Sequence, residues 1–144
     1  MFGIAPLAGE RTYWFSVHAS DLAEPIDAEA AFAQAAERFT RAAPAVRELL
    51  ANGAADTVPT RLWTTLPMSR YVNGRYVVIG DAAHAMMPNL GRGACSAIVD
   101  AATLAAAMNR GQGLSRWEAR RVPATQLARL GSGALMRLAV QRLA

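Results

Sequence analysis

One stretch restricts the fold of this chain more than any other: a short apolar run, then a glycine-rich loop, then a helix of small residues. Residues 75–79 read Arg-Tyr-Val-Val-Ile, and a continuous run of this kind is typical of a strand buried on both faces, as in a parallel sheet. The loop covers residues 80–93, and the pattern predicts a helix from Ala94 to about Asn109, ended by Arg110-Gly111. Strand, loop and helix in this order indicate an α/β fold.

The segments before this stretch predict a β-hairpin and then helices. Two β-favouring runs in residues 2–17 are separated by a tight turn, and Pro6 confines the first run to a sheet edge or a strand end. Asp27 is expected to cap a helix that Pro44 ends or kinks. An apolar helical face then continues until Asn52-Gly53.

Further patterns complete the expected secondary structure. Residues 60–66 are predicted as a strand, and Asn73-Gly74 as a turn. Ser115 and Glu118, three residues apart before a helical stretch, fit a capping box. Pro123 is expected to kink this last helix.

Charge and composition exclude several classes of protein. The 144 residues carry a net charge of +4, but the arginine surplus lies in a helical stretch without a recognised nucleic-acid module, so no nucleic-acid partner is expected. The longest apolar stretch, residues 94–108, is interrupted by Ser96 and Asp100, which argues against a membrane span. The single cysteine, Cys95, excludes a disulfide scaffold, and two histidines add no metal-ligand spacing. No secretory signal is visible at the start, so a cytoplasmic location is expected.

The loop and the helix start combine features of a ligand site. Ligands of open α/β sheets bind outside the carboxyl ends of the strands, where Asp81 is expected. Gly91 and Gly93 allow a close approach of backbone to a ligand. The helix that opens near Gly93 presents unpaired amides and the positive end of its dipole. These features favour a negatively charged group of a ligand. A carboxylate would repel such a group, so Asp81 is interpreted as an acceptor for hydroxyl groups instead.

These residues occur in a recognisable order. The chain reads Gly80-Asp81-Ala82-Ala83-His84, then Pro88, then Gly91-x-Gly93, then Asp100. This order resembles the second flavin motif of the single-component FAD-dependent aromatic hydroxylases, the group A flavoprotein monooxygenases. Residues 2–15 look like late strands of that family's substrate domain, and residues 120–123 like the helix that follows. The resemblance covers essentially the whole chain, but only the C-terminal part of the family.

The resemblance implies a fold with two parts. It implies part of an α/β, Rossmann-like FAD-binding domain plus part of a substrate domain. The expected elements are an N-terminal β-hairpin, helices, a buried strand and two C-terminal helices. Residues 1–66 are then a remnant of the substrate-domain sheet and helices, and residues 67–144 the C-terminal part of the FAD-binding domain.

The resemblance also implies roles for individual residues. Asp81 is expected to bond the ribityl hydroxyls of FAD, and the amides around Gly91 to Cys95 to face the pyrimidine edge of the isoalloxazine ring. The helix that starts there is expected to stabilise negative charge on the reduced flavin. Pro88 is expected either beside the flavin or as a loop stiffener. The expected cofactor-binding residues are Asp81, Gly91, Arg92, Gly93, Ala94 and Cys95; Trp14 and Met87 are candidate substrate contacts, and no metal ligand is assigned. Arg92 departs from the family's frequent Gln, and Met87 from a common second Pro.

The implied activity is hydroxylation of aromatic or similar electron-rich small molecules. NADH or NADPH reduces FAD, oxygen forms a C4a-hydroperoxide on it, and the terminal oxygen attacks the substrate ring. This chain has no Gly-x-Gly-x-x-Gly sequence for the ADP half of FAD, so it is expected to be inactive alone. We therefore interpret it as a truncated product, a product of an internal start, or one half of a split enzyme with a partner chain. The alternative is a non-catalytic binding or assembly module with a decayed flavin motif.

The remaining candidates have structural interpretations. His84 is interpreted as a structural hydrogen-bonding histidine, Asp100 as an anchor for a neighbouring element, and Cys95 as a small packing residue. Core positions are predicted for Trp14, Trp63 and Trp117, and a solvated helix face for Arg110, Arg116, Arg120 and Arg121.

Overall fold

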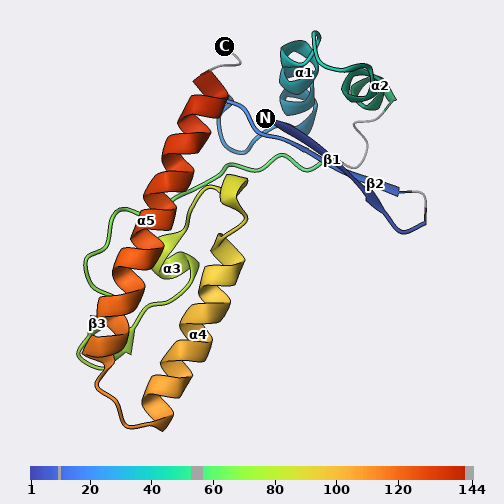
Figure 1. The fold of residues 1–144 in the computed structure, drawn as a ribbon. Helices are drawn as coiled ribbons and strands as arrows, with labels where there is room; N and C mark the ends of the chain where they lie inside the picture. Colours follow the sequence, from blue (N-terminus) through green and yellow to red (C-terminus); the bar gives the residue numbers. More distant parts are fainter. Residues whose placement is uncertain (10, 53–56, 142–144) are drawn as a thin grey trace. The chain divides into compact units, whose positions relative to one another are not determined.

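The computed structural model describes residues 1–9, 11–52 and 57–141 of the chain (Figure 1). Contacts divide the chain into unit 1, Met1–Arg61 with the residues from Ala139 onward, and unit 2, Leu62–Leu138. Glu10 of the predicted turn and Gly53 of the predicted helix stop lie outside the described residues. The predicted α/β class is confirmed, whereas the assignment of residues 1–66 and 67–144 to a substrate part and a flavin part stays a prediction.

Unit 1 begins with the predicted hairpin. β1 (Phe2–Leu7) pairs with β2 (Arg11–Ser16) in an antiparallel ladder. The rings of Phe2 and Trp14 stack with centroids 5.4 Å apart, and Phe2 meets Phe39 edge-on at 5.1 Å. An aromatic cluster therefore ties the hairpin to the helical segment that follows it.

Two helices follow the hairpin in unit 1. α1 (Ala28–Arg38) is capped by Asp27 as predicted, because the Asp27 Oδ1 accepts a hydrogen bond from the Ala30 N–H at 2.8 Å. The role predicted for Pro44 is wrong: it neither ends nor kinks this helix but begins α2 (Pro44–Asn52). A proline suits the first helical position, since the N–H that it lacks has no intrahelical partner there.

Unit 2 is built around two long helices with a short helix between them (Figure 1). Its elements are β3 (Val72–Asn73), β4 (Tyr76–Val77), α3 (Asp81–His84), the 3-10 turn η1 (Pro88–Leu90), α4 (Gly93–Asn109) and most of α5 (Leu114–Gln141). The buried core consists of Tyr71, Ala83, Ala107 and Trp117. The predicted bounds of α4 are confirmed to within one residue, and its end at Arg110-Gly111 is confirmed as well.

The strands of unit 2 are shorter than the sequence predicts. In the run 75–79 only β4 is a strand, and it pairs antiparallel with β3 around the predicted Asn73-Gly74 turn. A strand inside a parallel sheet needs a neighbour on each side, and the described residues supply only β3. Residues 60–66 form no strand either; Thr65 instead accepts and donates single hydrogen bonds with Arg129 and Ala85.

The predicted details of α5 are also corrected. Ser115 and Glu118 form no capping box, because α5 already begins at Leu114 and the Glu118 carboxylate bonds elsewhere. α5 continues through Pro123 as one helix, and the kink expected at this residue stays a prediction. None of the helices in the described part of the chain is long and apolar enough to cross a membrane.

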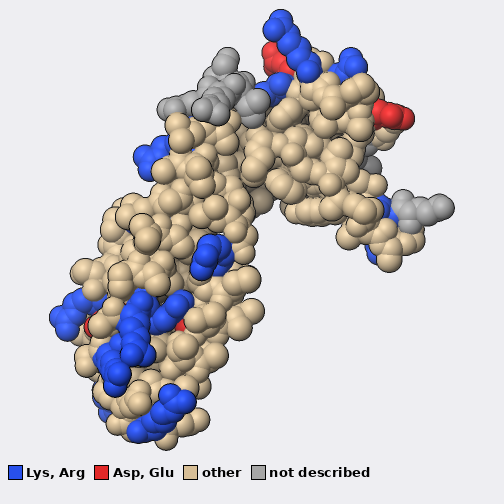
Figure 2. All heavy atoms as spheres, viewed as in Figure 1, with Lys and Arg blue, Asp and Glu red and all other residues tan. Residues whose placement is uncertain are grey.

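Basic side chains gather over the lower parts of α4 and α5 in the view of Figure 2. Arg110, Arg116 and Arg120 are exposed, as predicted for a solvated face. Arg121 is an exception, since its side chain is only 16% exposed and bonds a buried carboxylate. The prediction that placed Arg121 on the solvated face is therefore wrong.

Candidate functional site

The start of α3 lies against the first turns of α4. Gly80, the residue before α3, has φ of +60° and ψ of −142°, a combination that side chains rarely permit. A Cβ on Gly80 would lie 3.2 Å from the Cβ of Ala97 in α4, and the Gly80 N–H donates to Asp100 Oδ2 at 3.1 Å. The glycine is thus required by both its dihedral angles and its close contact, and it sets Asp81 beside the N-terminal half of α4.

Asp81 presents a free carboxylate at this position. It is the first residue of α3, its side chain is exposed, and it makes no hydrogen bond or ion pair with another described residue. An ionised carboxylate is an acceptor only, with capacity for several hydroxyl or N–H donors. The geometry therefore suits a ligand that carries hydroxyl groups.

α4 begins with backbone donors that no side chain satisfies. The residue before it, Arg92, makes no capping hydrogen bond, and its first turn contains no acidic residue. A helix start of this kind leaves the N–H groups of residues 93–95 without intrahelical acceptors. Gly91 before it has φ of +61° and open space where a Cβ would point. Together with the helix dipole, these amides attract a negatively polarised group.

The loop between α3 and α4 adds polar and apolar groups. Pro88 begins η1 and is exposed, while Met87 is half-buried. The Oδ1 atom of Asn89 is buried and has no hydrogen-bond partner among the described residues. Gly93 lies close to this loop, since a Cβ on it would be 4.0 Å from the Cγ of Met86.

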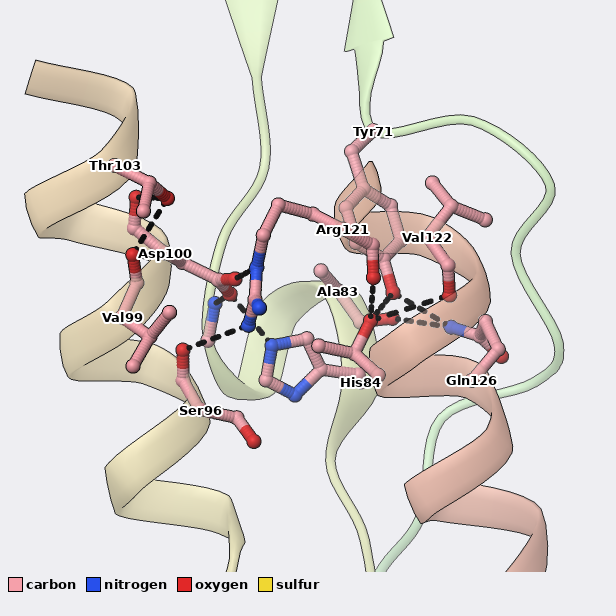
Figure 3. A network of polar contacts seen from close by, with 12 residues as sticks. Tyr71, Ala83, His84, Ser96, Val99, Asp100, Thr103, Arg121, Val122 and Gln126 are labelled. Atoms are coloured by element: carbon pink, nitrogen blue, oxygen red, sulfur yellow. Dashed lines mark hydrogen bonds and ion pairs between the residues drawn. The ribbon is translucent and has the colours of Figure 1, made fainter. Parts of the chain in front are cut away.

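Asp100 fastens this region from inside unit 2 (Figure 3). Its side chain is fully buried, and its Oδ2 accepts hydrogen bonds from the Gly80 N–H at 3.1 Å and from His84 Nε2 at 2.6 Å. Its Oδ1 accepts from Arg121 Nε at 2.7 Å. The interpretations of Asp100 as an anchor and of His84 as a structural hydrogen-bonding residue are confirmed.

The pKa of Asp100 shows which charge form the site holds. Burial raises the pKa of Asp100, but hydrogen bonds from His84, Gly80 and Arg121 and the Arg121 charge lower it further, leaving it below its usual value of 3.8. Asp100 is therefore a carboxylate at neutral pH, and Arg121 balances its charge.

A second set of polar contacts holds α3 and the segment before β3 against α5. Gln126 Nε2 donates to the Tyr71 hydroxyl at 2.9 Å and to the Ala83 carbonyl at 3.3 Å, and the Tyr71 hydroxyl lies 2.6 Å from Thr125 Oγ1. Because Thr125 donates to the Arg121 carbonyl, the Tyr71 hydroxyl is the donor to Thr125. These bonds add the Tyr71 segment to the network of Figure 3 and give α3 a second link to α5.

Glu118 plays the matching role for the segment before β3. Its Oε1 accepts from the N–H groups of Tyr71 and Val72 at 2.5 and 2.7 Å. The hydrogen bond from Val72 leads the causes that keep the pKa of Glu118 below its usual value, partly offset by burial and helped by Tyr71 and Arg70. A carboxylate on α5 thus holds one loop, as Asp100 on α4 holds another.

The structure confirms some of the sequence predictions for single residues, contradicts others and leaves the rest untested. Asp81, Pro88 and residues 91–95 all lie on α3, η1, the start of α4 and the segments that join them, and their cofactor roles stay predictions. Trp14 lies in unit 1, and its substrate role, like that of Met87, also stays a prediction. Cys95 is exposed and Trp63 is 71% exposed, so their predicted packing roles are wrong, whereas Trp117 is buried as predicted.

Sequence reasoning missed Arg121 and Glu118 as structural residues. Arg121 bonds a residue 21 positions away in the chain, and Glu118 bonds residues at least 46 positions away. Local sequence patterns do not predict contacts over such separations. One signal was available: a buried acid such as Asp100 on a helix of small residues requires a basic partner, and Arg121 lies on the next helix.

These residues suit one end of a flavin and give no site for a metal. Free backbone donors, an exposed carboxylate and an unpaired buried acceptor match a ligand with a negatively polarised edge and a hydroxylated chain. No group of three or more metal-ligating side chains occurs among the residues that the structure describes.

Comparisons with known proteins agree with this chemistry. The profile of a family described as FAD binding domain matches residues 2–121. Aurachin C monooxygenase/isomerase from Stigmatella aurantiaca is 34% identical over 105 residues, which are 72% of this chain and 27% of that protein. FAD-dependent urate hydroxylase from Klebsiella pneumoniae is 32% identical over 106 residues, again 72% and 27% of the two chains.

A solved structure has the same fold. The crystal structure of Klebsiella pneumoniae HpxO complexed with FAD and uric acid superposes with a TM-score of 0.81 at 27% identity. The match covers 97% of this chain and 38% of that one. The chain therefore spans between a quarter and two fifths of the length of these relatives.

Proposed function

The chain belongs to the FAD binding domain family, and we propose that it supplies the part of a monooxygenase flavin site that holds the isoalloxazine edge and the ribityl chain. One observation carries this proposal: the exposed Asp81 carboxylate is fixed beside an uncapped helix start by the contacts of Gly80 with α4. When bound, the flavin supplies the redox chemistry, and the chain supplies orientation and electrostatics.

Asp81 binds the ribityl chain in this proposal. Its carboxylate has no partner among the described residues, so accepting hydrogen bonds from ribityl hydroxyls displaces no existing protein contact. Hydrogen bonds to an ionised acceptor are among the stronger ones in proteins. This contact would hold the ribityl chain at the start of α3.

The N–H groups at the start of α4 bind the pyrimidine edge of the ring. Residues 93–95 provide these donors, and Gly91 leaves the approach open because it carries no side chain. Amides and a helix dipole aimed at a site of developing negative charge stabilise that charge without rearranging. Arg92, which is exposed next to these amides, adds a positive charge.

The ADP half of FAD lies outside this contact set. The chain contains no Gly-x-Gly-x-x-Gly sequence, the loop that carries the pyrophosphate in dinucleotide-binding units. We propose that another polypeptide segment, within a longer protein or in a partner chain, supplies that half. Under this proposal the complete assembly uses NADH or NADPH as electron donor in the cytoplasm, in line with the lone cysteine.

The substrate of the assembly is a small, electron-rich ring compound in this proposal. The relatives support it, since one is a urate hydroxylase and another an aurachin C monooxygenase/isomerase. Pro88 and the half-buried Met87 lie on the loop that leads to α4. This position supports the proposal that they would border the bound flavin.

A comparison of three flavins tests the proposal. Purified chain is titrated with riboflavin, FMN and FAD, and quenching of flavin fluorescence is followed. Because the chain contacts only the ring and the ribityl chain, the three dissociation constants should agree within about threefold, and Asp81→Asn should weaken all three about tenfold, the loss expected for a hydrogen bond to a charged group.

A control variant and two contradicting outcomes complete this binding experiment. Asp21→Asn removes an exposed acid in unit 1 and should leave binding unchanged. Binding of FAD at least a hundredfold tighter than riboflavin would show that the chain also holds the ADP half. Absence of binding to all three flavins would favour a non-catalytic module.

A further inference from the structure

We propose that Asp100 and His84 form a buried positioning pair for the flavin-facing turn, and that His84 acts through its Nε2–H alone. The pair is joined to the turn by the Gly80 N–H, and in the described part of the chain it makes no hydrogen bond to a proposed flavin contact. The inference rests on the proposed function for its binding readout, and it has a second readout that needs no flavin.

Asp100 joins three parts of unit 2 through one carboxylate. Its Oδ2 receives hydrogen bonds from the start and the end of α3, at Gly80 and His84, and its Oδ1 receives one from Arg121 of α5. Arg121 also donates to the Ser96 carbonyl at 3.3 Å, near the start of α4. Movement of the Asp100 side chain therefore shifts α3 relative to the helix start that faces the ring.

The turn needs this support because its backbone conformation is unfavourable. Gly80 has φ of +60°, and a Cβ on it would lie only 3.2 Å from the Cβ of Ala97. Its N–H is buried in the contact with Asp100, so loss of that acceptor leaves an unsatisfied donor. Asp81 is the next residue in the chain, so its position depends on the position of Gly80.

The contacts of His84 show which of its ring nitrogens meets a partner. The ring is fully buried, Nε2 lies 2.6 Å from the carboxylate, and Nδ1 is buried without a partner in the described part of the chain. Asp100 is an acceptor and Nδ1 has no partner among the described residues, so the ring acts on its surroundings through Nε2–H.

This assignment gives a matched pair of variants. Glutamine places an amide nitrogen near the position of Nε2, so His84→Gln retains a donor to Asp100. Asparagine is shorter and places its nitrogen near Nδ1, so His84→Asn loses that donor. Glutamine also fills more of the ring's volume than asparagine, so the donor is identified by the exchange rate at Gly80 and not by a loss of stability alone.

The binding experiment uses FMN titrated into the full chain. His84→Gln should change the dissociation constant less than about threefold, whereas His84→Asn and Asp100→Asn should raise it about tenfold or more. Glu118→Gln is the control, because Glu118 holds the Tyr71–Val72 segment from α5 in a similar way and makes no hydrogen bond to a described residue of α3 or α4. It should leave the dissociation constant unchanged at any temperature where the variant remains folded.

The second readout is amide hydrogen exchange without flavin. His84→Asn and Asp100→Asn should speed exchange at Gly80 at least tenfold while exchange at Val72 stays the same, and Glu118→Gln should do the reverse. Equal exchange at Gly80 in His84→Gln and His84→Asn overturns the positioning role. If this exchange pattern holds but the unchanged chain binds no FMN, the proposed function fails and the positioning pair stands.

Discussion

His84 Nε2 lies 2.6 Å from Asp100 Oδ2, and both side chains are fully buried. This contact joins residues 16 positions apart and closes α3 onto α4. Arg121 approaches the other oxygen of the same carboxylate, so the charge of Asp100 is balanced inside unit 2. The stability of the α3 region, which includes Asp81, therefore depends on the hydrogen bonds of the buried Asp100.

The first prediction concerns the pH dependence of stability. The pKa of Asp100 is lowered in the folded chain, so its stabilising contribution is complete above its unfolded value near 3.8 and is lost as pH falls through the lower folded pKa. Glu118 acts with the same sign, because its pKa is lowered from 4.5. The free energy of unfolding, measured with urea, should decline as pH falls from about 5 to about 3.

Asp100→Asn tests the source of this decline. The variant should be less stable than the unchanged chain by about 3 kcal/mol at pH 6. It leaves the charge of Arg121 without a counter-charge and weakens the hydrogen bond between Asp100 and His84. The difference should shrink as the pH falls below 3.8, because the unchanged chain loses the contribution of the carboxylate as the pH falls through its lowered folded pKa. A difference that stays constant over this range would assign the loss to packing.

The second prediction compares two glycines with positive φ. Gly80→Ala should destabilise the chain by roughly 2–3 kcal/mol, because it combines unfavourable dihedral angles with a Cβ 3.2 Å from Ala97. Gly91→Ala has a similar φ but open space, so it should cost only about 1 kcal/mol. Urea unfolding of the two variants measures the difference. Equal losses would mean that the contact with Ala97 relaxes.

Local patterns in the sequence predicted the elements that depend on neighbours in the chain. Asp27 caps α1, Gly91 precedes α4 and Gly93 begins it, and the hairpin of residues 2–17 forms, because each depends on residues a few positions apart. The strand predicted for residues 75–79 failed for the opposite reason. Its length depends on pairing partners, and β3 is the only one among the described residues.

The candidate site divides in the same way. Asp81 and the start of α4 were predicted from composition and spacing, and the structure sets them close together through Gly80 and Ala97. The support behind them was predicted only in part. Asp100 was expected to anchor something, but its bond with Arg121 spans 21 positions, and no local signal identifies that partner.

The third prediction concerns the hydroxyl of Tyr71. It accepts a hydrogen bond from Gln126 and donates one to Thr125, in a buried position between α3 and α5. Tyr71→Phe removes both bonds and leaves polar groups unsatisfied, so we expect a loss of about 1–3 kcal/mol in unfolding free energy. In a double-mutant cycle with Thr125→Val, the double variant should lose less than the sum of the single losses. Additive losses would show that the two hydroxyl groups do not interact.

The last prediction separates stability from binding at the start of α4. Ala94 is exposed in the first turn of this helix, which contains no acidic residue. A negative charge there interacts favourably with the helix dipole, so Ala94→Asp should stabilise the chain by about 0.3–1 kcal/mol relative to Ala101→Asp, an exposed control in the middle of the helix. The same charge should weaken FMN binding, since it repels the polarised ring edge and competes for the free N–H groups. Urea unfolding and fluorescence titration measure the two effects, which are expected to have opposite signs for Ala94→Asp. Tighter or unchanged FMN binding would mean that the amides of residues 93–95 do not face the flavin.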